Sequence, residues 1–223
     1  MIRIVICSPG SSFSKNFRRC WTNLLHYCWS NKIEIVLADA ESNNIYYVRT
    51  KCLGGDCLKG IYQKPWQGQI LYNYILWIDS DMTFSPDQLQ KLIDYNEPIV
   101  TGFYNWQGGN GLTCGHWDIE FYKTNGYMPY LTEKTILEQP KNDKGLIEVD
   151  YAGFGFLLVK YGIFEKMEYP WFRSFWTTVE INNKIISDFS MEDVAWCLAA
   201  KKLGYKILVD PTMKFGHEKT AIY

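Results

Sequence analysis

The stretch "YILWIDSDMTF", residues 74–84, decides how this chain is interpreted. Its first five residues are apolar or aromatic, which predicts a buried β-strand, and two aspartates separated by one serine follow directly. Desolvating an isolated carboxylate is expensive, and two close carboxylates repel unless a cation or a proton joins them. Although the bare spacing is common, its position after a buried strand makes Asp79 and Asp81 candidate ligands of a hard divalent cation.

Length and composition limit the classes of protein to consider. The chain has 223 residues, 47% of them hydrophobic, which is enough for one well-buried core and too little for two ordinary domains. A formal charge of −1 without a basic block argues against nucleic-acid binding. No apolar run reaches the roughly 20 residues that span a bilayer, and "MIRIVICSPG" fits a short strand and a turn better than a signal peptide.

The seven cysteines are scattered, odd in number and without CxxC spacing. This pattern argues against a zinc site or a disulfide framework and predicts reduced thiols. We therefore expect a cytoplasmic, reducing compartment.

Hydrophobic periodicity and capping residues predict alternating strands and helices. Strands are expected at Ile2–Cys7, Ile33–Ala38, Tyr74–Ile78, 98–104, the first part of 155–167 and 205–210. Helices are expected at Ser14–Trp29, at 45–53, after the cap Ser85, in the second part of 155–167, and from the cap Ser190 to Leu203. The Gly- and Pro-punctuated segment 54–69 is typical of a loop, and 105–148 is hard to assign.

This alternation predicts an α/β fold with a central, mostly parallel sheet flanked by helices. In such sheets, ligands bind beyond the carboxyl ends of the strands. Asp39 follows the second predicted strand, and Asp79 and Asp81 follow the third. The order of the chain therefore places these acids on one edge of the sheet.

Two enzyme classes use acids at such a strand end, and the first is the haloacid-dehalogenase-like phosphatases. Their first motif is DxDx[TV] after an apolar strand, which "DSDMT" matches. Asp79 would then be a nucleophile and Asp81 a general acid. That motif normally opens the chain, whereas a strand–helix–strand unit precedes it here, and we find no convincing partner lysine and acidic pair downstream.

The second class matches nearly the whole chain. "YYVRTKCL" resembles a helix with an arginine before the acidic strand, "YILWIDSDMTFSPDQLQKLI" the metal strand and the helix after it, and "PIVTGFYNW" the next strand. "DYAGFGFLLVKYGIFEKM" resembles a small-residue acceptor loop, and "SMEDVAWCLAAKKLGYKILVDPTMKFGHEKT" a catalytic helix followed by a histidine. In this order and spacing the chain resembles metal-dependent nucleotide-sugar glycosyltransferases of the GT-A type, most of all those encoded by large algal (chlorella) DNA viruses.

The resemblance implies a GT-A (Rossmann-like) fold and one glycosyltransferase domain over 1–223. Nucleotide and metal binding are expected in 1–104, and acceptor binding and catalysis in 105–223. The resemblance leaves open that this domain is cut from a longer protein. It implies a donor that is UDP-linked by family frequency, a glycan or glycoconjugate acceptor and, for a viral protein, the host cytoplasm.

A sugar donor of this kind carries a diphosphate leaving group, so the resemblance implies a Mn²⁺ or Mg²⁺ ion that bridges its oxygens. Asp81 is the expected direct ligand, and Asp79 shares the metal or holds the ribose. His217, in "FGHEK", is the expected ligand from the far end of the chain, because a neutral imidazole also suits Mn²⁺. By residue type alone, a lone histidine is as readily a packed or surface side chain.

The nucleotide is expected to contact residues from several strand ends. Arg49 would pair with phosphate oxygens as a planar, permanently charged donor, with an ordinary surface ion pair as the simpler role. The other expected nucleotide-binding residues are Asp39 at the base or ribose, Ser80, and the backbone of Ser8, Pro9 and Gly10.

The pair Glu192-Asp193 is the second acidic site. The resemblance implies an inverting transferase in which Asp193 takes the proton of the acceptor hydroxyl and Glu192 holds acceptor hydroxyls. The simpler role is helix capping, because Ser190 and Asp193 resemble a capping box and an acid in a first helical turn is favourable anyway. The helix N-terminus is expected to stabilise the carboxylate and lower its basicity.

The acceptor side carries weaker signals. Gly153, Phe154 and Gly155 are expected to let the backbone approach a sugar closely. The Gly-rich segment 105–117 is a candidate mobile flap over the donor. The aromatic residues available to stack on sugar faces are Tyr104, Trp106, His116, Trp117, Trp171 and Trp176, of which Trp106 is the preferred acceptor contact.

The sequence therefore leaves three hypotheses. The preferred one is an inverting, metal-dependent glycosyltransferase. The alternatives are the phosphatase with Asp79 as nucleophile, and a non-catalytic carbohydrate-binding domain that kept the fold.

Overall fold

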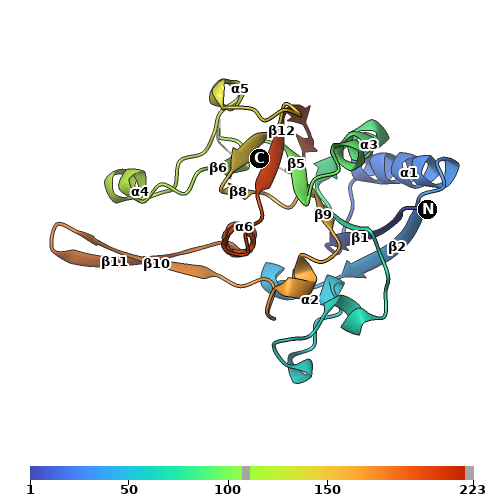
Figure 1. Ribbon diagram of the computed structural model, residues 1–223, viewed down its shortest axis with the longest axis horizontal. Coiled ribbons are helices and arrows are strands. Elements are labelled where there is room, and N and C mark those ends of the chain that lie inside the picture. Colours follow the sequence, from blue (N-terminus) through green and yellow to red (C-terminus); the bar gives the residue numbers. More distant parts are fainter. Residues whose placement is uncertain (107–110, 219–223) are drawn as a thin grey trace.

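The computed structural model describes residues 1–106 and 111–218 (Figure 1). Its helices are α1 (Lys15–Ser30), α2 (Ile45–Cys52), α3 (Pro86–Tyr95), α4 (Ile119–Asn125), α5 (Thr135–Glu138) and α6 (Glu192–Lys202). Its strands are β1 (Arg3–Pro9), β2 (Glu34–Ala40), β3 (Tyr74–Ile78), β4 (Met82–Thr83), β5 (Ile99–Phe103), β6 (Cys114–Gly115), β7 (Ile147–Val149), β8 (Tyr151–Ala152), β9 (Phe156–Lys160), β10 (Phe175–Ile181), β11 (Lys184–Ser190), β12 (Ile207–Lys214) and β13 (Gly216–His217).

Within these described ranges, seven strands form a central sheet in the order β2-β1-β3-β9-β5-β12-β7. β1 pairs in parallel with β2 and β3, and β5 pairs in parallel with β12. β9 runs antiparallel to its neighbours β3 and β5, and β7 runs antiparallel to β12. All strands of this sheet except β9 and β7 share one direction, which confirms the predicted mostly parallel α/β sheet.

The side-chain alternation of the strands divides the core into two clusters, one on each face of the sheet. Ile4 and Ile6 of β1 pack in the cluster that contains the apolar faces of α1 and α3, which lie together in Figure 1. Val5 and Cys7 pack in the cluster that contains residues of α2 and α6. Because both faces are covered, β3 is buried along its whole length, which explains its continuous apolar run.

Local capping chemistry sets the starts of several helices, but not those of α5, which follows Lys134, and α6. Ser14 and Ser85 are the N-caps of α1 and α3, as predicted. The predicted cap Ser190 is wrong: it ends β11, its hydroxyl donates to the Phe175 carbonyl (3.4 Å), and Met191 is the N-cap of α6. Ser190 pairs with Phe175 of β10 and so belongs to β11. The N-cap position of α6 is therefore the next residue, Met191.

The long hairpin β10–β11 had no sequence assignment. Its strands pair over their full length, from Phe175 opposite Ser190 to Ile181 opposite Lys184. Asn182 and Asn183 form the turn with φ of 51° and 61°, the left-handed region that Asn tolerates best among non-glycine residues. Figure 1 shows the hairpin as an arm that extends away from the sheet, with its base beside α6.

Two further observations concern the hydrophobicity of the helices and the state of the cysteines. No helix in the described ranges is long and apolar enough to cross a membrane. All seven cysteines of the chain lie in these ranges and are free thiols.

Candidate active site

Two metal-ligand candidates from distant parts of the chain lie side by side. β13 pairs antiparallel with β4, so His217 is opposite Met82, and the Glu218 N–H donates to the Asp81 carbonyl (2.7 Å). This pairing places His217 Nε2 3.3 Å from Asp81 Oδ2. The fold thus brings together two side chains that more than half of the chain separates.

The ring of His217 is oriented as a metal ligand would be. Its Nδ1 atom lies 2.8 Å from the Asn105 carbonyl oxygen, which can only accept, so Nδ1 carries a proton. In the neutral imidazole the lone pair is then on Nε2, which faces Asp81. Two oxygen or nitrogen ligands of one Mg²⁺-like ion, each at about 2.1 Å and at right angles, are about 3 Å apart. The separation of 3.3 Å between Nε2 and Oδ2 fits such a shared ion.

Asp81 and His217 would leave much of the coordination shell of this ion to other ligands. Among residues 1–106 and 111–218, no group of three or more His, Cys, Asp or Glu side chains is arranged to hold a metal. Hard divalent cations bound near phosphates commonly use one or two carboxylates and take further oxygens from the phosphates and water. The pair therefore fits an ion that is bound together with a diphosphate.

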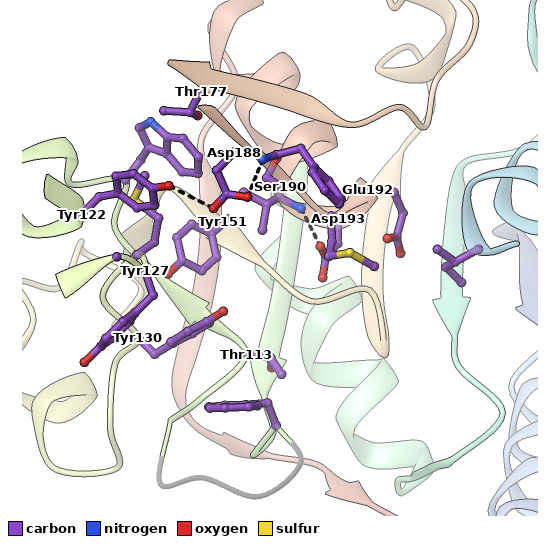
Figure 2. Close-up of a pocket in the computed structure, with 18 of the residues that line it drawn as sticks. Thr113, Tyr122, Tyr127, Tyr130, Tyr151, Thr177, Asp188, Ser190, Glu192 and Asp193 are labelled. Carbon is purple, nitrogen blue, oxygen red and sulfur yellow. Dashed lines mark hydrogen bonds between the residues drawn. The ribbon is translucent and has the colours of Figure 1, made fainter. Parts of the chain in front are cut away.

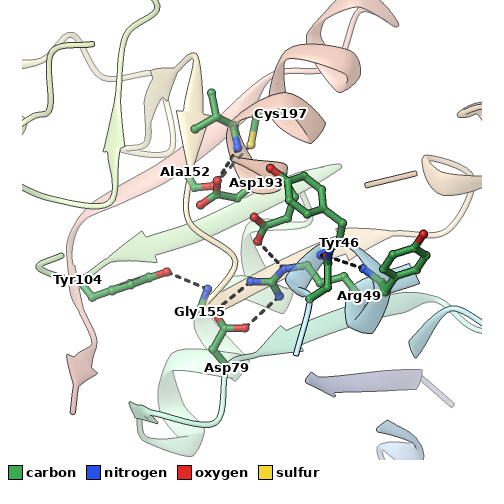
Figure 3. Close-up of polar contacts among 12 residues, drawn as sticks. Tyr46, Arg49, Asp79, Tyr104, Ala152, Gly155, Asp193 and Cys197 are labelled. Carbon is green, nitrogen blue, oxygen red and sulfur yellow. Dashed lines mark hydrogen bonds and ion pairs between the residues drawn. The ribbon is translucent and has the colours of Figure 1, made fainter. Parts of the chain in front are cut away.

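Arg49 of α2 lies at the centre of the site and is buried, with 4% of its side chain exposed. Its Nη1 and Nη2 atoms donate to the two carboxylate oxygens of Asp79 (2.9 and 3.1 Å), and its Nε donates to Glu192 Oε1 (3.0 Å). The guanidinium carbon also lies 5.6 Å from the ring centre of Trp77 and 5.1 Å from that of Phe154. Figure 3 shows Arg49 between Asp79 and the first turn of α6.

This environment differs from the surface ion pair or phosphate contact expected for Arg49. Each of its three side-chain nitrogens already donates to a carboxylate. Burial alone would lower the pKa of Arg49, but the charges of Asp79 and Glu192 raise that pKa further above its usual range. Arg49 is therefore a buried cation that fixes two acids at the positions where β3 ends and α6 begins.

Asp193 lies beside Glu192 in the first turn of α6, and its Oδ1 accepts the Val194 N–H (2.7 Å). Burial, and next the charge of Glu192, raise the pKa of Asp193 to about 7. The expectation that the helix N-terminus would lower its basicity is wrong in its net effect, because desolvation outweighs the favourable backbone contact. A carboxylate with this pKa is well matched to general-base chemistry near neutral pH.

A cavity of about 540 Å³ lies beside the start of α6 and is called the α6 cavity below. Arg49, Asp79, Glu192 and Asp193 line it, and Figure 2 shows Glu192 and Asp193 at the cavity. Aromatic side chains form much of the remaining wall: Trp106, Trp117, Tyr122, Tyr127, Tyr130 and Tyr151. Such a wall offers flat apolar faces and hydroxyl groups, which suits sugars.

Two further hollows lie at the carboxyl ends of β1, β2 and β3. The first, of about 320 Å³, is lined by Pro9, Gly10, Asp79, Ser80 and Asp81, together with residues at the start of α2. The second, of about 280 Å³, is lined by Ser8, Asp39, Leu37, Phe13, Phe17 and Trp21. The predicted nucleotide-binding residues other than Arg49 therefore line these two hollows, and Asp79 also lines the α6 cavity.

The predicted acceptor contact Phe154 is wrong. Phe154 is fully buried, with its ring packed against Trp77 and Trp196 at centroid distances of 5.6 and 5.0 Å. It offers no surface to an acceptor in this arrangement. Its contribution is to the apolar bed under Arg49.

Gly153 and Gly155 leave space for the ring of Tyr104, which packs against both glycines. Their predicted role, close approach of the backbone to a sugar, is therefore corrected. A Cβ atom would lie 2.3 Å from Tyr104 Oη at Gly153, and 2.7 Å from Tyr104 Cζ at Gly155. The Gly155 N–H also donates to Tyr104 Oη (3.1 Å; Figure 3). Both glycines are buried, so the group that leaves no room for a side chain is the ring of Tyr104 and not a bound sugar.

Replacing Gly155 by alanine is expected to lower the free energy of unfolding by about 1–3 kcal/mol, because the added methyl group overpacks the core. The methyl would meet Tyr104 and, at 2.8 Å, Met82 Sδ. Urea denaturation of the variant and the wild type measures the difference. An alanine variant as stable as the wild type would contradict this packing role.

The predicted sugar-stacking aromatics divide into two groups. Trp106 and Trp117 line the α6 cavity, and Trp106 is 45% exposed and stacks on Tyr130 (5.7 Å, 27°). The others do not line it: Tyr104 and Trp171 are in the core, His116 contacts Asp150, and Trp176 is exposed on β10. Within the predicted flap 105–117, residues 107–110 lie outside the described residues.

The sequence analysis missed the residues that the hairpin and α4 contribute to the α6 cavity. Thr177 comes from β10, Asp188 from β11, and Tyr122 from α4. A signal existed: two stretches of mixed apolar and polar residues flank "NN" at 182–183, a pattern typical of a hairpin. Their convergence on α6 is a long-range contact that no local pattern encodes.

Comparisons with known proteins support the fold alone. No protein-family model matches the chain, and no curated protein sequence matches it. Among solved structures, A197 from STIV is similar with a TM-score of 0.56 and 16% identity, over 98% of this chain and 87% of that one. A structure of GalNAc-T7 with UDP, GalNAc and Mn²⁺ is similar with a TM-score of 0.52 and 10% identity.

The second comparison covers 99% of this chain but 43% of GalNAc-T7, so this chain spans less than half of that protein. At such identities the similarity concerns backbone architecture. The central sheet and its flanking helices confirm the fold class that the sequence predicted. The chain has a GT-A-like α/β fold.

Proposed function

We propose that this protein is a metal-dependent glycosyltransferase that moves a sugar from a nucleotide-sugar, UDP-linked by preference, to a hydroxyl group of a glycan. One observation carries the proposal. Asp79 lines both the hollow that holds Asp81 and the α6 cavity that holds Asp193. A donor diphosphate on one side and an acceptor hydroxyl on the other would therefore meet at the carboxyl end of β3.

The donor is assigned to the two hollows at the strand ends. Asp81 and His217 would hold Mn²⁺ or Mg²⁺, which when bound neutralises charge on the diphosphate leaving group. The smaller hollow suits a base, because aromatic side chains line it together with Asp39 and the buried Ser8, whose Oγ has no hydrogen-bond partner among the described residues. Ser80 and the backbone of Pro9 and Gly10 are assigned to the ribose and diphosphate.

The acceptor is assigned to the α6 cavity. Its hydroxyl oxygen attacks the anomeric carbon while Asp193 takes the hydroxyl proton, and the bond from that carbon to the diphosphate oxygen breaks with its electron pair on oxygen. Attack from the side opposite the leaving group inverts the anomeric configuration. Glu192, whose Oε1 accepts from Arg49, fixes the cavity wall beside Asp193 rather than acting as a free acceptor ligand.

The phosphatase alternative has less support. It needs the Asp79 carboxylate to attack a phosphoryl group, yet both oxygens of Asp79 accept hydrogen bonds from the buried Arg49. A non-catalytic carbohydrate-binding role would leave the raised pKa of Asp193 without a use. Neither alternative explains the facing Asp81 and His217 side chains.

UDP together with Mn²⁺ is expected to raise the melting temperature of the wild type, and chelator is expected to remove the gain. Ligand that binds only the folded state stabilises by about 2.7 kcal/mol at one hundred times its Kd. Asp81→Ala and His217→Ala are each expected to weaken Mn²⁺ binding at least tenfold, measured by electron paramagnetic resonance of free Mn²⁺.

His26→Ala is the matched control, because His26 is exposed on α1. Unchanged Mn²⁺ affinity in the Asp81 and His217 variants would contradict the assigned ligands. A screen of UDP- and GDP-sugars for slow donor hydrolysis then identifies the donor.

The finer expectations extend the same proposal. We infer one domain over 1–223, with its donor half in 1–104 and its acceptor half in 105–223, and a reducing, cytoplasmic location. Strands of the central sheet come from both halves, and the free thiols of all seven cysteines suit such a compartment. Kinship with glycosyltransferases of large algal DNA viruses remains a prediction from sequence resemblance.

A further inference from the structure

The hairpin supplies one polar corner of the α6 cavity that the proposed chemistry does not use. Thr177 of β10 and Asp188 of β11 are direct cross-strand partners, and both side chains line the cavity. Tyr122 of α4 closes the corner, with its hydroxyl donating to Asp188 Oδ2 (3.0 Å; Figure 2). The groups used in the proposed chemistry come from the end of β3 and the start of α6. Thr177 and Asp188 come from the hairpin instead.

The hydroxyl of Thr177 is the first sign of a ligand here. Thr177 is 9% exposed, and its Oγ1 has no hydrogen-bond partner among the described residues. A buried hydroxyl without a partner costs about 1–3 kcal/mol in protein mutation studies. Thr177 lines the cavity, so a rotation about its Cα–Cβ bond would turn the hydroxyl toward a bound molecule, which would satisfy it both as donor and as acceptor.

The carboxylate of Asp188 has capacity to accept more hydrogen bonds. Its Oδ1 accepts the Phe189 N–H (2.8 Å) and its Oδ2 accepts the Tyr122 hydroxyl. A carboxylate has about four acceptor positions, so two further donors can be bound. Both protein contacts fix the orientation of Asp188 toward the cavity.

The charges that line the cavity select the class of ligand. Four carboxylates line it, from Asp79, Asp188, Glu192 and Asp193, and its basic side chain is Arg49. Arg49 is paired with the carboxylates of both Asp79 and Glu192, which offset its positive charge, so its attraction for a further anion is weak. An anionic group in the cavity would be repelled, whereas neutral hydroxyl groups can donate to these acids.

We propose that Thr177 and Asp188 form a distal acceptor subsite that binds hydroxyl groups of a second sugar unit, so the acceptor is a neutral oligosaccharide. One sugar hydroxyl donates to Asp188, and another oxygen accepts from Thr177 Oγ1. A cavity of about 540 Å³ lies within the range of about 300–1,000 Å³ typical of pockets for small-molecule ligands. This inference rests on the proposed function for the position of the reacting sugar next to Asp193.

The test measures glycan binding with donor and metal absent. The probes are neutral disaccharides of several linkages, the methyl glycosides of their single sugars, and matching disaccharides that end in a uronic acid. Calorimetric titration of the wild type is expected to detect neutral disaccharides with at least tenfold higher affinity than both other groups.

Thr177→Val removes the hydroxyl and keeps the β-branched shape. Its affinity for the best disaccharide is expected to fall about 5- to 10-fold, as for one lost hydrogen bond, with no change for the single sugar. The melting temperature of the same variant is expected to stay equal or rise, because an unsatisfied buried hydroxyl is gone. If the hydroxyl had only a structural role, Thr177→Val would not lower the affinity for the disaccharide while leaving the melting temperature equal or higher.

Thr178→Val is the matched control, because Thr178 is the next residue of β10, is exposed and points to the opposite face. Equal disaccharide affinity in Thr177→Val and wild type, or preferred binding of uronic-acid glycans, would overturn the inference. Binding of no disaccharide, while UDP and Mn²⁺ still stabilise the protein, would overturn it too and leave the donor site intact. Loss of the UDP and Mn²⁺ effect instead counts against the proposed function.

Discussion

Replacing Asp193 by asparagine is expected to slow sugar transfer by a factor of about 10²–10⁴, the usual contribution of a positioned general base. Asparagine keeps the size of the side chain but cannot take the proton of the acceptor hydroxyl. The stabilisation by UDP and Mn²⁺ is expected to persist, since Asp193 does not line the donor hollows. Initial rates with the donor identified by the hydrolysis screen measure the effect.

Asp87→Asn is the matched control for this variant. Asp87 is an exposed acid in the first turn of α3, a position equivalent in helix electrostatics to that of Asp193 in α6. Full transfer activity in Asp193→Asn would show that the acid only favours the helix start. Loss of activity in both variants would point to a general effect of charge at helix N-termini.

The pH dependence follows from the same carboxyl group. With the pKa of Asp193 at about 7, wild-type kcat/KM is expected to rise with pH up to that value and then level off. An unfolded aspartate has a pKa of about 4, so the folded state binds the extra proton between these values. The stability that this group contributes is therefore complete below pH about 4 and is lost as pH rises through about 7.

The stability readout is independent of turnover. Because asparagine never acquires the buried charge, the melting temperature of Asp193→Asn relative to wild type is expected to be higher at pH 8 than at pH 5. Scanning calorimetry at both pH values measures this difference. An equal difference at both values would contradict the raised pKa.

Replacing Arg49 by methionine is expected to cost about 3–5 kcal/mol of stability, as when one partner of a buried ion pair is removed. Glu192 is almost fully buried and Asp79 is three-quarters buried, so both carboxylates would lose their compensating charge. At about 2–4 °C per kcal/mol for a chain of this size, the melting temperature falls by about 6–20 °C. Methionine keeps an unbranched apolar stem between Trp77 and Phe154.

Two further variants make this prediction specific. Arg19→Met is the matched control, since Arg19 is exposed on α1 and its loss is expected to change stability little. Adding Asp79→Asn and Glu192→Gln to Arg49→Met is expected to restore part of the stability, because no buried charge then lacks a partner. If the free energy of unfolding of Arg49→Met lies within about 1 kcal/mol of the wild-type value, the guanidinium does not organise the site.

Local sequence signals predicted most elements that form the sheet and the hollows at its carboxyl edge. The strand Tyr74–Ile78 has the predicted bounds, and α2 differs from the predicted 45–53 by one residue. These elements are set by short-range properties, namely apolar runs and capping residues, that a sequence displays directly. The grouping of Asp39, Asp79 and Asp81 near one sheet edge follows from the topology of a parallel sheet.

The remaining features depend on tertiary contacts. Arg49 has the same residue type whether it lies at the surface or between two acids, and only packing against Trp77 and Phe154 makes it a buried cation. The basicity of Asp193 was predicted from the helix end, a local rule, whereas burial by distant segments decides it. The α6 cavity combines α4, the hairpin and α6, which are adjacent only in the folded chain.

Because β4 and β13 pair antiparallel, binding of the proposed metal and donor would also affect the stability of the protein. A cation shared by Asp81 and His217 would act as a cross-link that encloses more than half of the polypeptide in one loop. Closing so long a loop removes many conformations from the unfolded chain, so the gain in stability exceeds that of the two contacts alone. Substrate concentration in the cell would then influence how long the protein survives as well as how fast it works.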